Sequence, residues 1–104
     1  MTEELMHEIV RRILTVARPS RVIVFGSAAA GTLLRDSDVD LLVLKDDGVD
    51  HWEESHRIRG ALMGLGVPFD VIVMSTERFE ETKDVVGGIA YPAHKQGIVV
   101  YEAA

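Results

Sequence analysis

The sequence of 104 residues has no cysteine, few aromatic residues and fewer bases than acids. Without cysteine, a disulfide framework, a thiol nucleophile and a thiolate metal site are excluded, and we expect a reducing, cytoplasmic setting. Lys and Arg number 11 against 17 Asp and Glu, which gives a formal net charge of -6. Because nucleic-acid binding depends on bases that neutralise phosphates, this balance disfavours nucleic acid as a partner.

The sequence also lacks an apolar run of the roughly 20 residues that span a bilayer. Its first residues, MTEELMHEIV, carry acids where a secretory signal needs bases. We therefore expect no membrane association. The content of hydrophobic residues, 47%, is high enough for a core without disulfides. We expect a single domain over residues 1–104.

Hydrophobic spacing predicts helices that alternate with strands. Apolar residues four apart predict a helix over 5–17, with Thr2 as its N-cap. Apolar runs predict strands over 21–25, 38–44, 68–74 and 98–101. Further helices are predicted over 50–65, 76–83 and about 85–95. The alternation indicates an α/β (α+β) fold in which helices cover a small mixed sheet of about four strands.

Negative charge gathers between residues 36 and 54, where eight acids accompany one base, Lys45. Asp38 and Asp40 open a predicted strand, so both carboxylates leave the same face of the sheet. Two such carboxylates repel each other unless solvent or a hard divalent cation such as Mg²⁺ separates them. A metal site and a solvent-facing strand edge both fit this pattern. We expect the remaining acids of the cluster, Asp46, Asp47, Asp50, Glu53 and Glu54, to form a solvated turn and helix start.

Asp70 interrupts another apolar strand, where a buried carboxylate without a partner would be costly. We therefore expect it to be paired, either with an arginine (Arg21, Arg57 or Arg59) or with a metal shared with Asp38 and Asp40. Among the aromatic residues, Trp52 is expected to pack on the apolar face of its helix.

Gly26 and Ser27 directly follow the first predicted strand. A glycine there permits a tight turn, and the backbone amides of such a turn can bind a phosphate. An ordinary turn is the alternative. The spacing from Gly26 to Gly31-Thr32 is similar to a P-loop, but the lysine that binds the phosphates is absent, so this interpretation is excluded.

Gly26-Ser27, ten intervening residues and Asp38-Val39-Asp40, within VIVFGSAAAGTLLRDSDVDLLVL, together resemble the signature of the DNA polymerase β nucleotidyltransferase superfamily. More closely, the sequence resembles the minimal nucleotidyltransferases encoded beside HEPN-domain partners in bacteria and archaea. The resemblance covers nearly the whole sequence, including the strand of Asp70 and the closing GIVVYE. It implies a polymerase β-like fold and the metal-dependent transfer of a nucleoside monophosphate from an NTP to a hydroxyl.

The resemblance also implies roles for single residues. Asp38 and Asp40 would bind two divalent ions, Mg²⁺ or Mn²⁺. Asp70 would hold the catalytic ion and help to activate the acceptor hydroxyl. Gly26 and Ser27 would bind the β and γ phosphates of the nucleotide.

One stretch departs from the superfamily. Relatives commonly have an arginine or another large polar residue after Gly-Ser, where this sequence has Ala28-Ala29-Ala30. Arg35 is the candidate to supply the missing nucleotide contact. The departure leaves nucleotide affinity open.

Two functions remain open at this point. The first is an antitoxin enzyme that transfers AMP from ATP, or another NTP, to a hydroxyl of a HEPN-domain partner. The second is a binding module that has kept the fold and neutralises its partner by contact alone. Size favours a protein partner, because relatives that modify antibiotics or RNA usually carry an extra helical domain to hold the acceptor. The acceptor, the preferred nucleotide and the oligomeric state, including a homodimer, are undetermined by the sequence.

Overall fold

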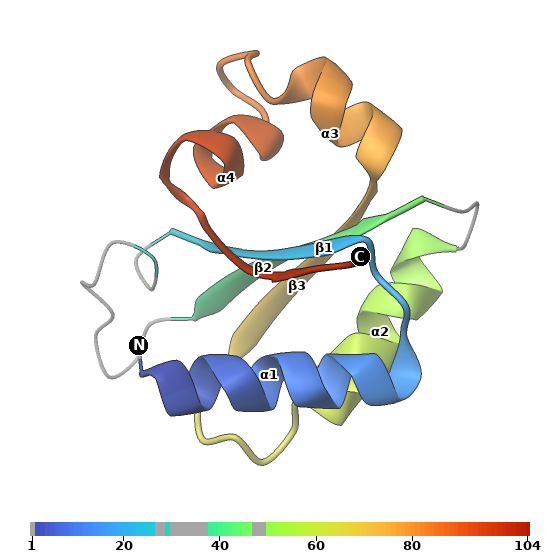
Figure 1. The fold of residues 1–104 in the computed structure, drawn as a ribbon, viewed down its shortest axis with the longest axis vertical. Coiled ribbons are helices and arrows are strands. Elements are labelled where there is room, and N and C mark those ends of the chain that lie inside the picture. Colours follow the sequence, from blue (N-terminus) through green and yellow to red (C-terminus); the bar gives the residue numbers. More distant parts are fainter. Residues whose placement is uncertain (1, 27–28, 30–37, 47–49) are drawn as a thin grey trace.

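The computed structural model describes residues 2–26, 29, 38–46 and 50–104. Within these residues, four strands form one mixed sheet and four helices pack on it (Figure 1). The elements are α1 (Glu3–Val16), β1 (Arg21–Phe25), β2 (Val39–Lys45), α2 (His51–Ala61), β3 (Phe69–Ser75), α3 (Thr76–Thr82), α4 (Ala90–Gln96) and β4 (Ile98–Glu102). The predicted fold class is confirmed. Of the helices described, none is long and apolar enough to cross a bilayer.

The sheet has the strand order β3-β2-β1-β4. β1 is antiparallel to both β2 and β4, whereas β2 and β3 are parallel and connected through α2. As a result, the end of β1 and the starts of β2, β3 and β4 lie at the same end of the sheet. Residues far apart in the sequence therefore meet there.

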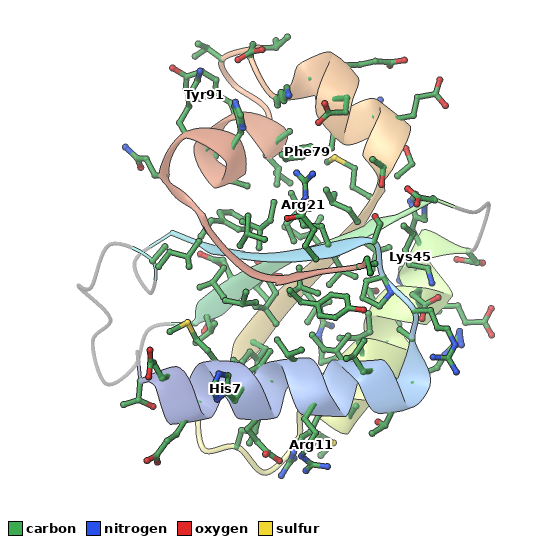
Figure 2. All side chains as sticks on the ribbon, viewed as in Figure 1. His7, Arg11, Arg21, Lys45, Phe79 and Tyr91 are labelled. Carbon is green, nitrogen blue, oxygen red and sulfur yellow. The ribbon has the colours of Figure 1, made fainter. Side chains whose placement is uncertain are left out.

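Two hydrophobic layers enclose the sheet, with α1 and α2 on one face and α3 and α4 on the other (Figure 1). β2 contributes to both layers because successive side chains point to opposite faces. Val39, Leu41 and Val43 belong to the α1/α2 layer, and Leu42 and Leu44 belong to the α3/α4 layer. Phe79 anchors α3 in the second layer (Figure 2).

Local sequence signals account for the helix starts. The Thr2 hydroxyl accepts a hydrogen bond from the amide of Leu5, as predicted for an N-cap. Asp50 caps α2 and Ser75 caps α3 in the same way. The helix predicted from residue 85 begins only at Ala90, because two poor helix formers, Gly87-Gly88, precede it.

Two expectations for α2 are wrong. Trp52 is 72% exposed and contacts the ring of His56, whereas Glu54, expected in solvent, is 3% exposed. The buried side of α2 carries Glu54 and Ile58, four residues apart on one face. Trp52 lies two residues before Glu54 and therefore points away from the sheet.

Candidate active site at the start of β2

The candidate site consists of three carboxylates at the end of the sheet where β2 and β3 begin. Asp40 and Asp70 are direct partners in the parallel register of these strands. Asp38 stands just before β2, two residues from Asp40. Asp40 is half-buried, while Asp38 and Asp70 are exposed. The structure thus brings together the three acids that the sequence singled out.

The electrostatics of the site show an excess of negative charge. Burial, followed by the charges of Asp70 and Asp38, raises the pKa of the Asp40 carboxyl. Within the described part of the chain, none of the ion pairs or side-chain hydrogen bonds involves any of the three carboxylates. Their mutual repulsion is therefore not relieved by the described side chains.

The expected burial and arginine pairing of Asp70 are wrong. Its side chain is exposed near the start of β3, an edge strand of the sheet. Arg21 instead lies 3.7 Å from Glu102, and Arg57 lies 3.9 Å from Glu54. An exposed carboxylate needs no internal partner, and Asp70 can be reached by a ligand from solvent.

Gly26 ends β1 next to Asp40. Its φ of 73° lies in the left-handed region, which favours glycine. In addition, a Cβ at this position would collide with Oδ2 of Asp40. Glycine therefore lets the turn approach the carboxylate closely. Ser27 and Arg35, the other predicted nucleotide contacts, lie outside the described residues.

The donor set fits a hard divalent cation. Carboxylate oxygens are the ligands that Mg²⁺ prefers, and a cation would relieve the charge excess around Asp40. In the described ranges, no group of three or more acids or histidines is arranged to enclose a metal. Magnesium sites commonly use one or two carboxylates together with water and substrate phosphates.

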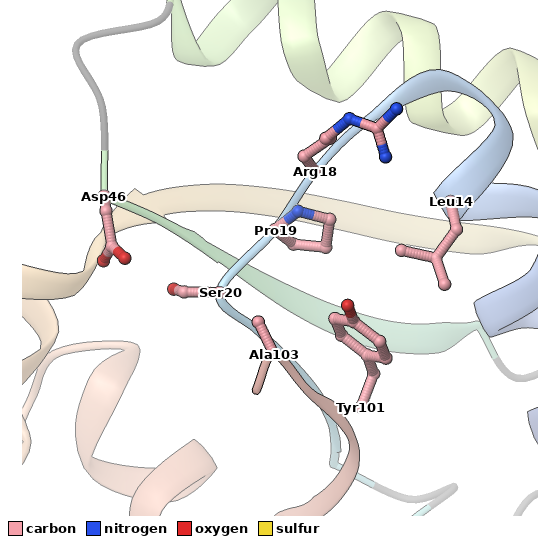
Figure 3. A pocket seen from close by; sticks show the side chains of 7 residues that line it. All are labelled: Leu14, Arg18, Pro19, Ser20, Asp46, Tyr101 and Ala103. Atoms are coloured by element: carbon pink, nitrogen blue, oxygen red, sulfur yellow. The ribbon is translucent and has the colours of Figure 1, made fainter.

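A hollow of about 400 Å³ lies elsewhere, between the α1–β1 connection and the end of β4 (Figure 3). Its lining residues are Leu14, Arg18, Pro19, Ser20, Asp46, Tyr101 and Ala103. None of the sequence-predicted site residues that the structure describes belongs to it. Asp46 is the one acid among the described lining residues, so these residues offer no comparable cluster of metal ligands.

Comparisons with known proteins identify the family and the fold. The profile of the nucleotidyltransferase domain family matches residues 5–95, whereas a search of curated proteins finds no match. Among solved structures, the chain is similar to a toxin-antitoxin with AMP-PNP, with 22% identity and a TM-score of 0.67 over 94% of this chain and 73% of that chain.

Two further structures share the fold. In the MntA-HepT toxin-antitoxin, identity is 17% and the TM-score 0.61, over 98% of this chain and 74% of that one. In the tri-AMPylated Shewanella oneidensis HEPN toxin in complex with MNT antitoxin, identity is 18% and the TM-score 0.57, over 99% and 74%. At these identities the likeness concerns the fold. The family match spans most of the sequence and includes Gly26, Asp38, Asp40 and Asp70, so the chain belongs to the nucleotidyltransferase domain family.

Proposed function

We propose that the chain transfers AMP from ATP to a hydroxyl of a partner protein, and that Asp38, Asp40 and Asp70 bind the divalent metal ions of the reaction. One observation carries this proposal. Asp40 and Asp70 face each other on adjacent strands, Asp38 is two residues away, and no described cation neutralises them. A chain in this family that keeps an uncompensated carboxylate cluster has retained what metal binding requires.

The reaction is an in-line displacement. The acceptor oxygen forms a bond to the α-phosphorus of ATP, the bond from that phosphorus to the oxygen bridging to the β-phosphate breaks, and pyrophosphate leaves. Two bound divalent ions, Mg²⁺ or Mn²⁺, would supply stabilisation of the attacking and leaving oxygens. Asp70 is exposed and takes the proton of the hydroxyl.

The nucleotide is held by the turn after β1. Gly26 lies against the Asp40 carboxylate, so phosphates bound by Gly26 and Ser27 would lie beside the carboxylates. Arg35 is proposed as a further nucleotide contact. The sequence has no polar side chain at Ala28-Ala29-Ala30, so nucleotide binding would depend on backbone amides, on the metal ions and on Arg35.

The solved structures suggest the acceptor. One similar toxin-antitoxin structure contains AMP-PNP, and another contains a tri-AMPylated HEPN toxin with an MNT antitoxin. By analogy, we propose that the acceptor is a HEPN-domain protein in the cytoplasm, that residues 1–104 act as a single nucleotidyltransferase domain, and that AMP transfer makes the chain an antitoxin.

The test combines the full chain, Mg²⁺, ATP labelled on the α-phosphate and the protein encoded by the adjacent reading frame. We expect label on the partner, and we expect Asp38→Asn and Asp40→Asn to abolish it. Asp46→Asn, a matched change at the other end of β2, should leave transfer unchanged. Asp70→Asn should lower transfer more than it lowers Mg²⁺-dependent ATP binding, measured by calorimetry.

Two outcomes would contradict the proposal. If the label never moves although the two proteins form a stable complex, the chain neutralises its partner by contact alone. If chelation of divalent ions leaves transfer or ATP binding intact, the carboxylates do not serve as metal ligands.

A further inference from the structure

The strand β4 forms an open edge of the sheet. Within the described residues it pairs with β1 alone, so its outer side presents backbone groups without a strand partner. Ile98 and Val99 on this strand are 41% and 50% exposed. Apolar side chains on an unpaired edge are typical of a surface that another segment covers.

A groove runs beside this edge, between β4 and the first half of α1. It encloses about 220 Å³ and is lined by Glu3, Met6, His7, Ile98, Val99 and Val100. A groove between a helix and an exposed edge strand can accept an extended peptide as an added strand. The peptide backbone then pairs with the edge, and alternate side chains enter the groove.

The groove lies at the same end of the sheet as the candidate active site. Val24 is the register partner of both Ile98 on β4 and Leu41 on β2, and Leu41 directly follows Asp40. Neighbouring strands lie about 4.8 Å apart, and β1 lies between β4 and β2. Ile98 is therefore roughly 10 Å from Leu41, the residue that follows Asp40. A segment that continues past Ile98 at this end of the sheet would reach the carboxylates within a few residues.

Charge and strand shape indicate which occupant fits. Glu3 lines the groove, Glu102 ends β4 with an exposed side chain 3.7 Å from Arg21, and Asp38 lies exposed beyond the other end of the strand. A basic segment therefore fits better than an acidic one. The register shift between Val22 and Ile23 leaves Val100 without a partner on β1. Such a bulge twists the edge, so a short segment that can follow the twist pairs with it more readily than the preformed edge of a second copy of this chain would.

We propose that β4 binds an extended segment of the acceptor protein as a fifth strand. The segment has apolar residues at alternate positions and at least one Lys or Arg, and it leads the acceptor hydroxyl toward Asp40 and Asp70. This inference rests on the proposed function, because it assigns the docking surface for the same acceptor.

The test measures binding rather than transfer. The probe is the adjacent-frame protein, titrated by calorimetry against the full chain carrying Asp38→Asn, so that docking is measured without AMP transfer. In this background, Val99→Lys should weaken binding by about tenfold or more. Val86→Lys is the matched control, because Val86 is 77% exposed on the α3–α4 connection, and it should change binding by less than about twofold.

Hydrogen exchange of the Asp38→Asn protein provides a second measurement that needs no change on β4. Those backbone amides of residues 98–102 that do not bond to β1 in the free chain should become protected in the complex. Loss of affinity at Val99 together with this protection supports the proposal. Equal affinities of the two lysine variants, or unprotected β4 amides in the complex, overturn it.

Other outcomes are also decisive. Absence of a complex overturns this docking surface. A homodimer of the unmodified chain that Val99→Lys converts to monomers also overturns it, because a second copy of the chain would then occupy the edge. If docking on β4 is found but label never moves, the proposed transfer fails while this inference stands.

Discussion

The two ends of β2 differ in how their charged side chains are paired. At its start, Asp38 and Asp40 lie near Asp70, and burial and like charges raise the pKa of Asp40. At its end, Lys45 is 4% exposed, and its Nζ lies 3.9 Å from Oε2 of Glu54. One end therefore accumulates charge of a single sign, whereas the other pairs opposite charges in the interior.

The difference separates a structural role from a functional one. Lys45 also donates a hydrogen bond to the carbonyl of Arg18, and Arg57 lies 3.9 Å from the other Glu54 oxygen (Figure 2 shows Lys45 beside α2). These charges are compensated by the protein itself, so they hold α2 and the α1–β1 connection against the end of β2. Among the residues that the structure describes, no cation compensates the carboxylates at the start in this way, which is what a site for an external cation requires.

The largest expected effect on stability comes from removing the buried Lys45–Glu54 ion pair at the end of β2. Lys45→Met should lower the free energy of unfolding by about 3 kcal/mol, because it removes the buried cation beside Glu54 and leaves this buried carboxylate only the exposed Arg57 at 3.9 Å. Urea denaturation measures this change. AMP transfer by the folded variant should persist, since Lys45 is at the opposite end of β2 from the site.

Lys83→Met is the matched control. Lys83 lies 3.0 Å from Glu80, but this pair is on the surface, and its loss should cost less than about 1 kcal/mol. The double variant Lys45→Met/Glu54→Leu should recover most of the stability, because it removes both buried charges. Equal losses for Lys45→Met and Lys83→Met would show that the buried pair has no special role.

The second prediction concerns Gly26, which lies next to Asp40 at the start of β2. Gly26→Ala should lower stability by about 2 kcal/mol, because it combines a strained φ with a collision against Asp40. Gly66→Ala shares the positive φ but meets nothing within 4 Å, so it should cost about 1 kcal/mol. Thermal unfolding compares the two.

The matched glycines also separate stability from function. Mg²⁺-dependent ATP binding should fall in Gly26→Ala and stay unchanged in Gly66→Ala, because Gly26 alone of the two contacts a proposed metal ligand. Equal binding by both variants would remove Gly26 from the site.

Much of this architecture could be predicted from the sequence because its signals are local. The strands follow from apolar runs, and the cap at Thr2 follows from residue type and spacing. The juxtaposition of Asp40 and Asp70 was suggested by the family signature, but its register depends on the pairing of β2 with β3, which no single segment encodes.

The errors share a physical cause. Burial of Glu54, exposure of Trp52 and exposure of Asp70 depend on which side of an element faces a neighbour. The sequence of α2 is nearly as polar on one side as on the other, so its buried face could not be identified from spacing. Lys45 ends an apolar strand, and a buried base needs an acid as its partner. This base was the one available signal for a buried acid nearby.

The smallest expected effect, that of Asp40→Asn on stability, tests the contrast between the two ends of β2 most directly. Because the folded chain raises the pKa of Asp40, its ionisation opposes folding. This unfavourable contribution is absent at low pH, where Asp40 is protonated in both states. The unfavourable contribution grows as the pH rises from the usual pKa of an aspartate to the raised pKa of Asp40 in the folded chain. At higher pH it stays constant. Without divalent ions, Asp40→Asn should therefore stabilise the chain at pH 7 by a few tenths to about 1 kcal/mol.

The gain from Asp40→Asn should vanish at about pH 3. Adding Mg²⁺ should reverse the order at pH 7, because a cation that binds the folded carboxylates stabilises the unmodified chain and not the variant. Thermal unfolding with and without Mg²⁺ measures both effects. A variant less stable than the unmodified chain in the absence of metal would mean that the Asp40 carboxylate is compensated internally, as Lys45 is by Glu54, and the contrast between the two ends of β2 would disappear.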